Sequence, residues 1–187
     1  CQREGRGAPL GTILARVADR IRPPQLAGHP HQIAEGAREA LCLTGPVGAA
    51  RMSDLAAHLG AFAGEWKDWH LAGSPVPDGT FALIRSNGVI PELCSDFAGS
   101  RTLWYAMTET HFFASTSQRA LVVLLGGLEL NRSAFAWFLS SGTLGPTDAW
   151  DARVRRLPRE ARLSLDQAAW TLDLHAGPLS FEPVPMK

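Results

Sequence analysis

The stretch SDFAGSRTLWYAMTETHFFASTSQRAL, residues Ser95 to Leu121, decides the fold class of this sequence. It contains two short β-rich runs, TLWYAM and THFFAST, which are separated by Met107-Thr108-Glu109. Short runs of this composition, bounded by turn residues, are typical of antiparallel strands with tight connections. A helix start follows at about Gln118. We therefore expect a pair of adjacent strands and then a helix.

The same pattern extends on both sides of this stretch. Two earlier runs, TFALIRS and VIPELCSD, meet at Asn87-Gly88, a pair that favours a tight hairpin turn. Helices are expected at about 118–125 and 132–139, followed by two final strands, ARLSLD and AWTLDLH. Mixed helices around an antiparallel meander indicate an α+β fold.

The first third of the chain is expected to contain two helices, with a loop and a short strand between them. Apolar residues at helical spacing predict a first helix over about 10–22, and residues 25–38 show no period and are expected to form a loop. The short run ALCL is a candidate buried strand. Ser53-Asp54 offers a helix cap before an apolar stripe, so a second helix is expected to end near His70. The stripe consists of Leu55, Leu59, Phe62, Ala63 and Trp66.

Composition restricts the class of protein. The 187 residues are 45% hydrophobic, which is enough for one domain with a sizeable core. Eighteen basic and eighteen acidic residues cancel, and no segment gathers enough Lys or Arg to predict a nucleic-acid partner. No run approaches the roughly 20 apolar residues of a membrane helix, and Cys1 to Pro9 is too polar for a signal peptide. A soluble, cytoplasmic protein is expected.

The three cysteines are Cys1, Cys42 and Cys94. Their number and spacing predict neither a disulfide framework nor a metal site, and the six histidines are too scattered to add metal ligands. Cys42 and Cys94 lie in apolar runs and are expected to be buried thiols. Cys1 differs, because a first-residue cysteine with a free α-amino group can combine a nucleophile and a base.

Four segments, in order, carry a family resemblance. They are DGTFALI (78–84), DFAGSRTLWYA (96–106), FFASTSQRALVVL (112–124) and VRRLPREARLSLD (154–166). Together they resemble the N-terminal glutaminase domain of the asparagine synthetase family of amide-forming enzymes. The resemblance implies that residues 1–187 form one glutamine amidotransferase type 2-like domain, a fragment or separate half of such an enzyme. It also implies a sandwich of two antiparallel sheets between helix layers, as in Ntn hydrolases.

In that family an N-terminal cysteine hydrolyses glutamine, which makes Cys1 the candidate nucleophile. Here Cys1 leads into QREGRGAP and not into the family's hydrophobic first strand, so that strand is expected to be missing. The family's RLSIxD and NGEIYN segments, which hold the glutamine and the oxyanion, are also absent. Arg51 is a candidate replacement for the family's arginine, but a solvated residue is the simpler interpretation. We therefore predict a degenerate, non-hydrolytic domain, with an active Cys1 glutaminase as the alternative.

The segment DFAGSR is predicted to form a structural turn. Gly99 supplies a positive φ, and Arg101 is expected to return to backbone carbonyls or to a carboxylate such as Asp96. A role as a turn clamp is a simpler explanation of Asp96 and Arg101 than a role in catalysis.

The resemblance also predicts a partner. The family's synthetase half carries an SGGxDS phosphate loop that this sequence lacks, so ATP and Mg are expected only in a synthetase domain, in cis or in trans. A homodimer is the other partner considered. Trp66, Trp69, Trp137 and Trp150 are candidates for a docking surface, since large aromatic residues are favoured at interfaces. Residues Ser140 to Asp151 are expected to expose apolar surface.

Overall fold

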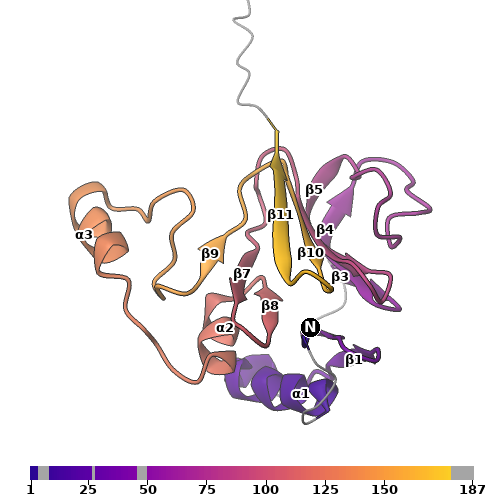
Figure 1. Ribbon diagram of the computed structural model, residues 1–187, viewed down its shortest axis with the longest axis horizontal. Helices are drawn as coiled ribbons and strands as arrows, with labels where there is room; N and C mark the ends of the chain where they lie inside the picture. Colours follow the sequence, from indigo (N-terminus) through magenta and orange to yellow (C-terminus); the bar gives the residue numbers. More distant parts are fainter. Residues whose placement is uncertain (4–8, 27, 46–49, 178–187) are drawn as a thin grey trace, which may run out of the picture.

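The computed structural model describes residues 1–3, 9–26, 28–45 and 50–177, and Figure 1 shows their arrangement. The elements, in chain order, are α1 (Leu10–Ile21), the 3-10 helix η1 (Pro24–Leu26), β1 (Gln32–Glu35), β2 (Ala40–Leu43), β3 (Ala50–Ser53), β4 (Ala56–Phe62), β5 (Gly79–Ser86), β6 (Pro91–Ser95), β7 (Trp104–Met107), β8 (Phe112–Ser115), α2 (Gln118–Leu124), α3 (Arg132–Ser141), β9 (Arg155–Arg156), β10 (Ala161–Asp166) and β11 (Thr171–Ala176). Within these residues no helix is long and apolar enough to cross a membrane.

The largest sheet has six strands in the order β11-β10-β6-β5-β4-β3, and each neighbouring pair is antiparallel. Its central strands have apolar side chains on both faces. Leu83, which lies opposite Cys94, is completely buried on one face, while Ala82 and Leu93 contribute to the core on the other. A strand covered on both faces explains why the run TFALI is almost continuously apolar.

A three-stranded sheet, in the order β8-β7-β9, packs against this large sheet. One core cluster joins the two sheets: Leu93 and Leu163 come from the large sheet, whereas Phe112 and partly buried Tyr105 come from the small one. The two sheets therefore face each other across a shared apolar layer. A separate two-stranded hairpin, β1-β2, lies beside them.

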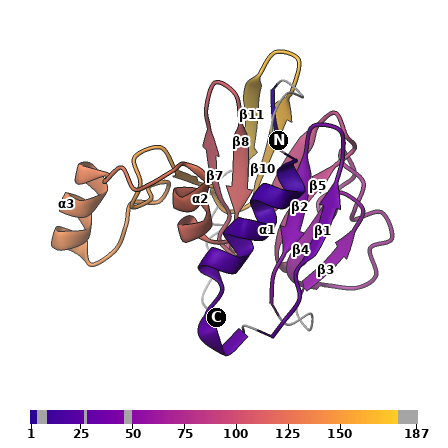
Figure 2. The same ribbon diagram turned by 90° about the horizontal axis from the view of Figure 1, so that it is seen from below.

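Among the described residues, the helices that pack on strands do so on the small sheet and on the β1-β2 hairpin. Leu121 of α2 is fully buried against Ala106 of β7, and α1 packs on β1, β2 and α2 (Figure 2). The outer face of the large sheet carries Phe81 and Leu83, which pack with Trp69 and Val76 from the segment between β4 and β5. The expectation of helix layers on both sides is therefore wrong for the large sheet.

The helix expected from Ser53 to His70 is also wrong. Residues Ala50–Ser53 and Ala56–Phe62 are instead the antiparallel strands β3 and β4, with Ser53 paired to Ala56 across a two-residue turn. Asp54 has a φ of 46°, a left-handed conformation typical of such hairpin turns and not of a helix cap. Residues 25–38 likewise contain β1 in addition to loop.

The meander predicted from residues 95–121 is confirmed. β7 and β8 are adjacent antiparallel strands, with Tyr105 opposite Ala114, and α2 follows directly. The two final strands, β10 and β11, pair from Ala161 to Ala176. The chain is thus an α+β fold built on antiparallel sheets.

Candidate functional site

The first residues of the chain lie along the edge of the small sheet. The α-amino group of Cys1 donates to the Phe112 carbonyl over 2.9 Å, and the Phe112 amide donates back to the Cys1 carbonyl over 3.0 Å. Gln2 forms an isolated antiparallel bridge with His111. Cys1 is therefore held beside β8, although a full first strand of the kind found in the resembling family is not formed by the described residues.

A second set of bonds brings Glu39 to the same place. The Gln2 amide donates to the Arg38 carbonyl over 2.8 Å, and Arg38 Nε donates to the Gln2 carbonyl over 3.2 Å. Glu39 follows Arg38 immediately, at the start of β2. The turn before β2 therefore places a carboxyl group near the N-terminal cysteine.

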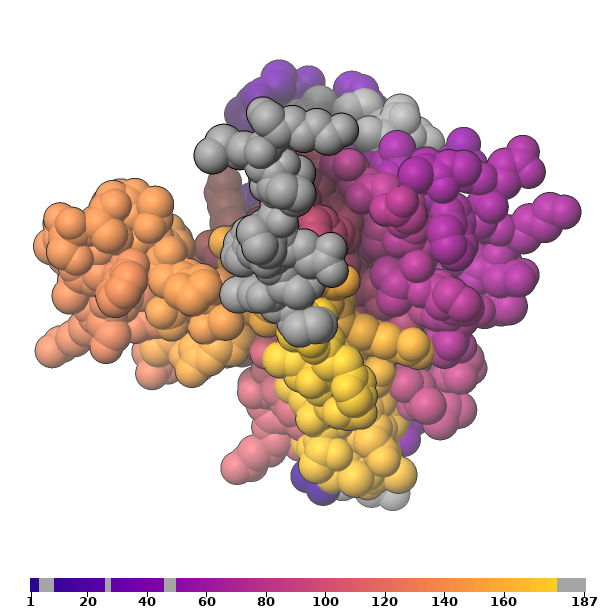
Figure 3. Space-filling model, turned by 90° about the horizontal axis from the view of Figure 1, so that it is seen from above, coloured from indigo at the N-terminus to yellow at the C-terminus, as the bar shows by residue number. Residues whose placement is uncertain are grey.

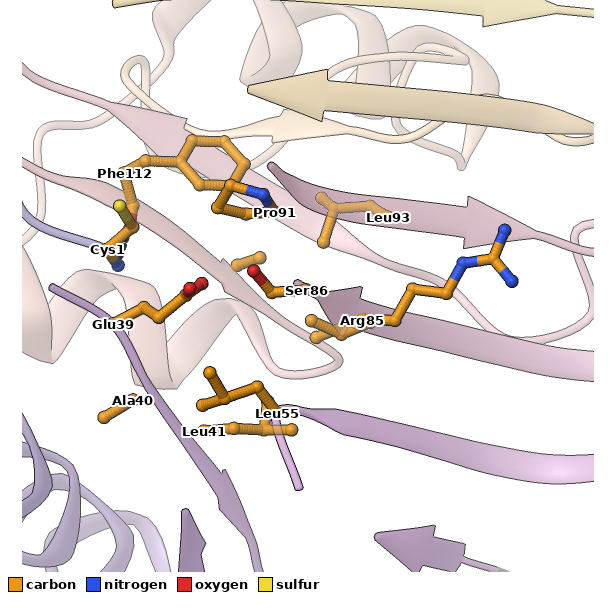
Figure 4. A pocket seen from close by; sticks show the side chains of 12 residues that line it. Cys1, Glu39, Ala40, Leu41, Leu55, Arg85, Ser86, Pro91, Leu93 and Phe112 are labelled. Atoms are coloured by element: carbon orange, nitrogen blue, oxygen red, sulfur yellow. Dashed lines mark hydrogen bonds between the residues drawn. The ribbon is translucent and has the colours of Figure 1, made fainter. Parts of the chain in front are cut away.

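Cys1 and Glu39 line a small pocket of about 70 Å³, which we call the Glu39 pocket. Its walls are mainly apolar, and Figure 4 shows its side chains. The lining residues that matter most to its chemistry are Cys1, Glu39, Ile84, Ser86, Leu93 and Phe112. Arg85 also lines it, but only with its aliphatic part, because its guanidinium points away from the pocket.

Burial changes the proton affinity of the amino group in this pocket. It lowers the pKa of the Cys1 α-amino group from 8.0 to about 6, and the negative charge of Glu39 opposes this change only in part. The pKa of the neighbouring His111 is also lowered, first by burial and then by the positive charge of the amino group. Burial therefore favours the uncharged form of the Cys1 amine, which is the form that can accept a proton.

Cys1 also lines a larger pocket of about 510 Å³ beside α1, together with His111 and Arg153. Cys1 therefore shares a pocket with an arginine. The guanidinium is nevertheless occupied: Nε and Nη2 of Arg153 donate to Asp151 over 2.9 and 2.7 Å, and Nη2 donates to the Gly127 carbonyl over 2.6 Å. These bonds lower the pKa of Asp151 to about 2 despite the opposing effect of its burial.

Arg51, the candidate replacement for the family's arginine, does not reach Cys1. It lies on β3, exposed to solvent and opposite His58 of β4, and it lines neither of the two pockets that contain Cys1. The structure therefore separates Arg51 from the candidate nucleophile.

The turn residues are arranged around Asp96. Its carboxylate accepts hydrogen bonds from the Phe81 amide over 2.8 Å, from the Ser100 amide over 3.0 Å, and from the Ser100 hydroxyl. Burial acts to raise the pKa of Asp96, but these bonds outweigh it and leave the pKa lowered. Gly99 has a φ of 62°, as the turn requires, whereas Arg101 is exposed and Ser100 provides the clamp instead.

A different kind of surface lies at α3, which stands apart from the sheets at one end of the molecule (Figures 1 and 3). Trp137 is 56% exposed and Leu139 70% exposed, and Phe135 and Phe138 are exposed beside them. Trp150 is half-buried beneath this helix, with its ring 5.1 Å from that of Phe138. We call the four exposed side chains the α3 surface.

The apolar exposure that was expected at residues 140–151 is found on α3 instead. The exposed residues of 140–151 are polar apart from Gly142 and Pro146. Trp66 and Trp69 do not lie on a helix: Trp69 packs edge-on against His58, and Trp66 Nε1 donates to the Ala63 carbonyl over 2.9 Å.

Glu39 is the site residue that sequence reasoning missed. The only signal was a charged residue directly before the apolar run ALCL, and such a residue is usually solvated.

No protein-family model and no curated protein matches this sequence. Among the residues that the structure describes, no three His, Cys, Asp or Glu side chains come together as a group that could hold a metal ion.

Proposed function

We propose that this chain is a glutaminase-like domain, of the sandwich type found in Ntn hydrolases, that belongs to an ATP-dependent, asparagine synthetase-type amide-forming enzyme of the cytoplasm. It acts as a docking scaffold for the synthetase domain, in cis or in trans, and does not itself hydrolyse glutamine. ATP and Mg bind to that partner domain. The proposal rests on the four resembling segments and on the α3 surface.

The α3 surface is the observation that carries the docking role. Four large apolar side chains are exposed on one ten-residue helix, and Asn131 caps this helix by accepting from the Ala134 amide. The helix is attached by a short bridge between Leu130 and Asp151 and by the buried Ala134. Clustered exposed aromatic residues of this kind mark interaction sites on soluble proteins.

The absence of hydrolysis is supported by the surroundings of Cys1. A glutamine substrate needs a group that binds its carboxylate, and the only arginine head group in the Cys1 pockets, within the described residues, is that of Arg153. Its guanidinium already donates to Asp151, Leu125 and Gly127. An arginine paired in this way is a structural group, not a free clamp.

The test is binding to a separately expressed synthetase domain encoded beside this chain. Replacing Trp137 and Leu139 together by alanine should weaken binding by about tenfold or more, as expected for exposed aromatic anchors. Phe97→Ala is the matched control, because Phe97 is also 70% exposed but lies in the Asp96 turn. Absence of binding, or equal binding by the α3 and Phe97 variants, would defeat the docking role.

An active glutaminase is the second candidate, favoured by the lowered pKa of the Cys1 amine, which lies beside its own thiol. In this reaction the amine takes the thiol proton, the sulfur attacks the glutamine amide, ammonia leaves with that proton, and water then releases glutamate from the thioester. The measurement is ammonia release from glutamine by protein whose first residue is Cys1. Activity that is lost in Cys1→Ala and retained in Cys94→Ala would establish this function in place of the scaffold role.

A further inference from the structure

Glu39 is a buried residue whose carboxyl group interacts electrostatically with the Cys1 amino group. The residue is 6% exposed, and its Oε1 has no hydrogen-bond partner among the described residues. A buried ionised oxygen without a hydrogen bond or counter-ion is strongly unfavourable. Figure 4 shows that the Glu39 carboxylate points into the pocket between Cys1 and Ser86. The unsatisfied oxygen is therefore directed at the space that a ligand would occupy.

The other polar groups of the pocket do not satisfy this charge. Arg85 turns its guanidinium to Glu92 on the far side of the sheet, at 2.6 Å. The Cys1 amine donates to the Phe112 carbonyl, and burial lowers its pKa to about 6. Ser86 Oγ accepts from the Gly88 amide over 3.1 Å, which leaves its own proton for a further contact. Within the described residues, the pocket therefore contains a carboxyl oxygen that accepts no hydrogen bond, together with an amine and a hydroxyl group.

The walls and size of the pocket restrict what it can hold. Ile84, Leu93 and Phe112 form an apolar wall next to the carboxylate. The volume of about 70 Å³ is less than half that of a cavity known to bind benzene, so only a few non-hydrogen atoms fit. A strongly hydrated metal ion gains little from an apolar wall and a single carboxylate.

We propose that the Glu39 pocket binds a small primary alkylammonium ion, whose N–H groups donate to Glu39 and whose alkyl part packs on Phe112, Leu93 and Ile84. The proposal does not rest on the docking function, because the α3 surface lies elsewhere on the chain. Charge-assisted hydrogen bonds of this type are stronger than neutral ones, and the apolar wall distinguishes an alkylammonium ion from a bare cation.

The experiment measures binding of ethylammonium chloride by calorimetry and by NMR shifts of Phe112 and Ala114, with sodium chloride at equal ionic strength as reference. A ligand with three non-hydrogen atoms is limited to weak affinity, so saturation with a dissociation constant of about 1–10 mM is expected. Glu39→Gln should weaken binding by at least about tenfold, because the charge is lost while the shape is kept. Glu109→Gln is the matched control, since Glu109 is exposed and lies outside the pocket.

A second variant, Ala114→Val, tests the proposal even if Glu39→Gln does not fold. Ala114→Val adds volume to the pocket wall and leaves the carboxylate in place, so ethylammonium binding should fall while the fold is kept. No saturable binding by the wild-type protein, or binding that Glu39→Gln and Ala114→Val both leave unchanged, would overturn the proposal. The NMR spectrum of each variant shows whether it is folded. A folded variant with Trp137 and Leu139 replaced by alanine should bind ethylammonium as the wild-type protein does, because the α3 surface lies outside the pocket.

Discussion

Two buried glutamates lie on opposite faces of the large sheet, and their surroundings differ completely. Glu92 is fully buried and accepts hydrogen bonds from Arg85, Arg162, the Gly73 amide and the Cys94 thiol. Glu39 is nearly as buried, yet its Oε1 has no partner among the described residues.

The hydrogen bonds of Glu92 make it a structural group, whereas the Glu39 carboxyl group can still accept a hydrogen bond from a ligand. Burial acts to raise the pKa of Glu92, but its hydrogen bonds outweigh burial and leave the pKa lowered, so the group stays ionised within a closed network. The same network raises the pKa of Cys94, through burial first and then through the charge of Glu92, which leaves this thiol unreactive. Among the described residues, no such network of hydrogen bonds surrounds Oε1 of Glu39.

The largest effect on stability is expected when Glu92 is replaced. Glu92→Leu leaves the Arg85 guanidinium buried without its counter-ion, so the free energy of unfolding should fall by about 3–5 kcal/mol. Urea denaturation followed by circular dichroism measures it. The double variant Arg85→Met/Glu92→Leu should recover most of the loss, since it removes both charges together. A single variant as stable as the wild type would show that the pair is not a closed structural unit.

The next largest effect is the pH dependence of stability that the Cys1 α-amino group causes. Its pKa is lower in the folded protein than in the unfolded chain, so the unfolded chain binds more protons between pH 6 and 8 and stability rises with pH across this window. Two pKa units correspond to about 2–3 kcal/mol. His111, whose pKa is also lowered, acts in the same direction, while Glu39 opposes the change.

Urea denaturation at several pH values measures this slope in protein that begins at Cys1. A variant with one glycine added before Cys1 converts the amine to an amide and should lose most of the slope. An identical slope in the two proteins would contradict the burial of the amino group.

The smallest effect on stability is expected when Glu39 itself is replaced. Glu39→Met removes an unsatisfied polar group and keeps a similar length, so the unliganded protein should become more stable by about 1 kcal/mol. Glu109→Met, at an exposed position, should change stability by less than about 0.5 kcal/mol. Thermal and urea unfolding of both variants give the answer. A clear loss of stability in Glu39→Met would mean that the carboxylate is paired in solution.

The sequence predicted the meander correctly because its signals are local. The short β-rich runs of β5 to β8 are bounded by turn residues such as Asn87-Gly88, and both their composition and the turns point to strands. β4 was predicted wrongly because it is covered on both faces: Leu59, Phe62 and Leu55 then match a helical stripe as well as a strand. Its turn at Asp54 was mistaken for a helix cap, since aspartate favours both positions.

The candidate site was less predictable, because it is assembled across the chain. Cys1 drew notice through its chemistry, but nothing near Glu39 in sequence shows that Gln2 binds Arg38 and brings the two together. The apolar composition of α3 was readable, whereas its exposure depends on its distance from both sheets.

The bonds between Cys1 and Phe112 have a consequence for the order of events during synthesis. Residues 1 and 2 leave the ribosome before their partners exist, and at usual elongation rates the wait is on the order of 10 s. For most of this interval α1 can pack on the β1-β2 hairpin but not yet on α2. The nascent chain is therefore expected to bind chaperones until β8 and α2 emerge, and slowing translation after residue 43 should lengthen that contact.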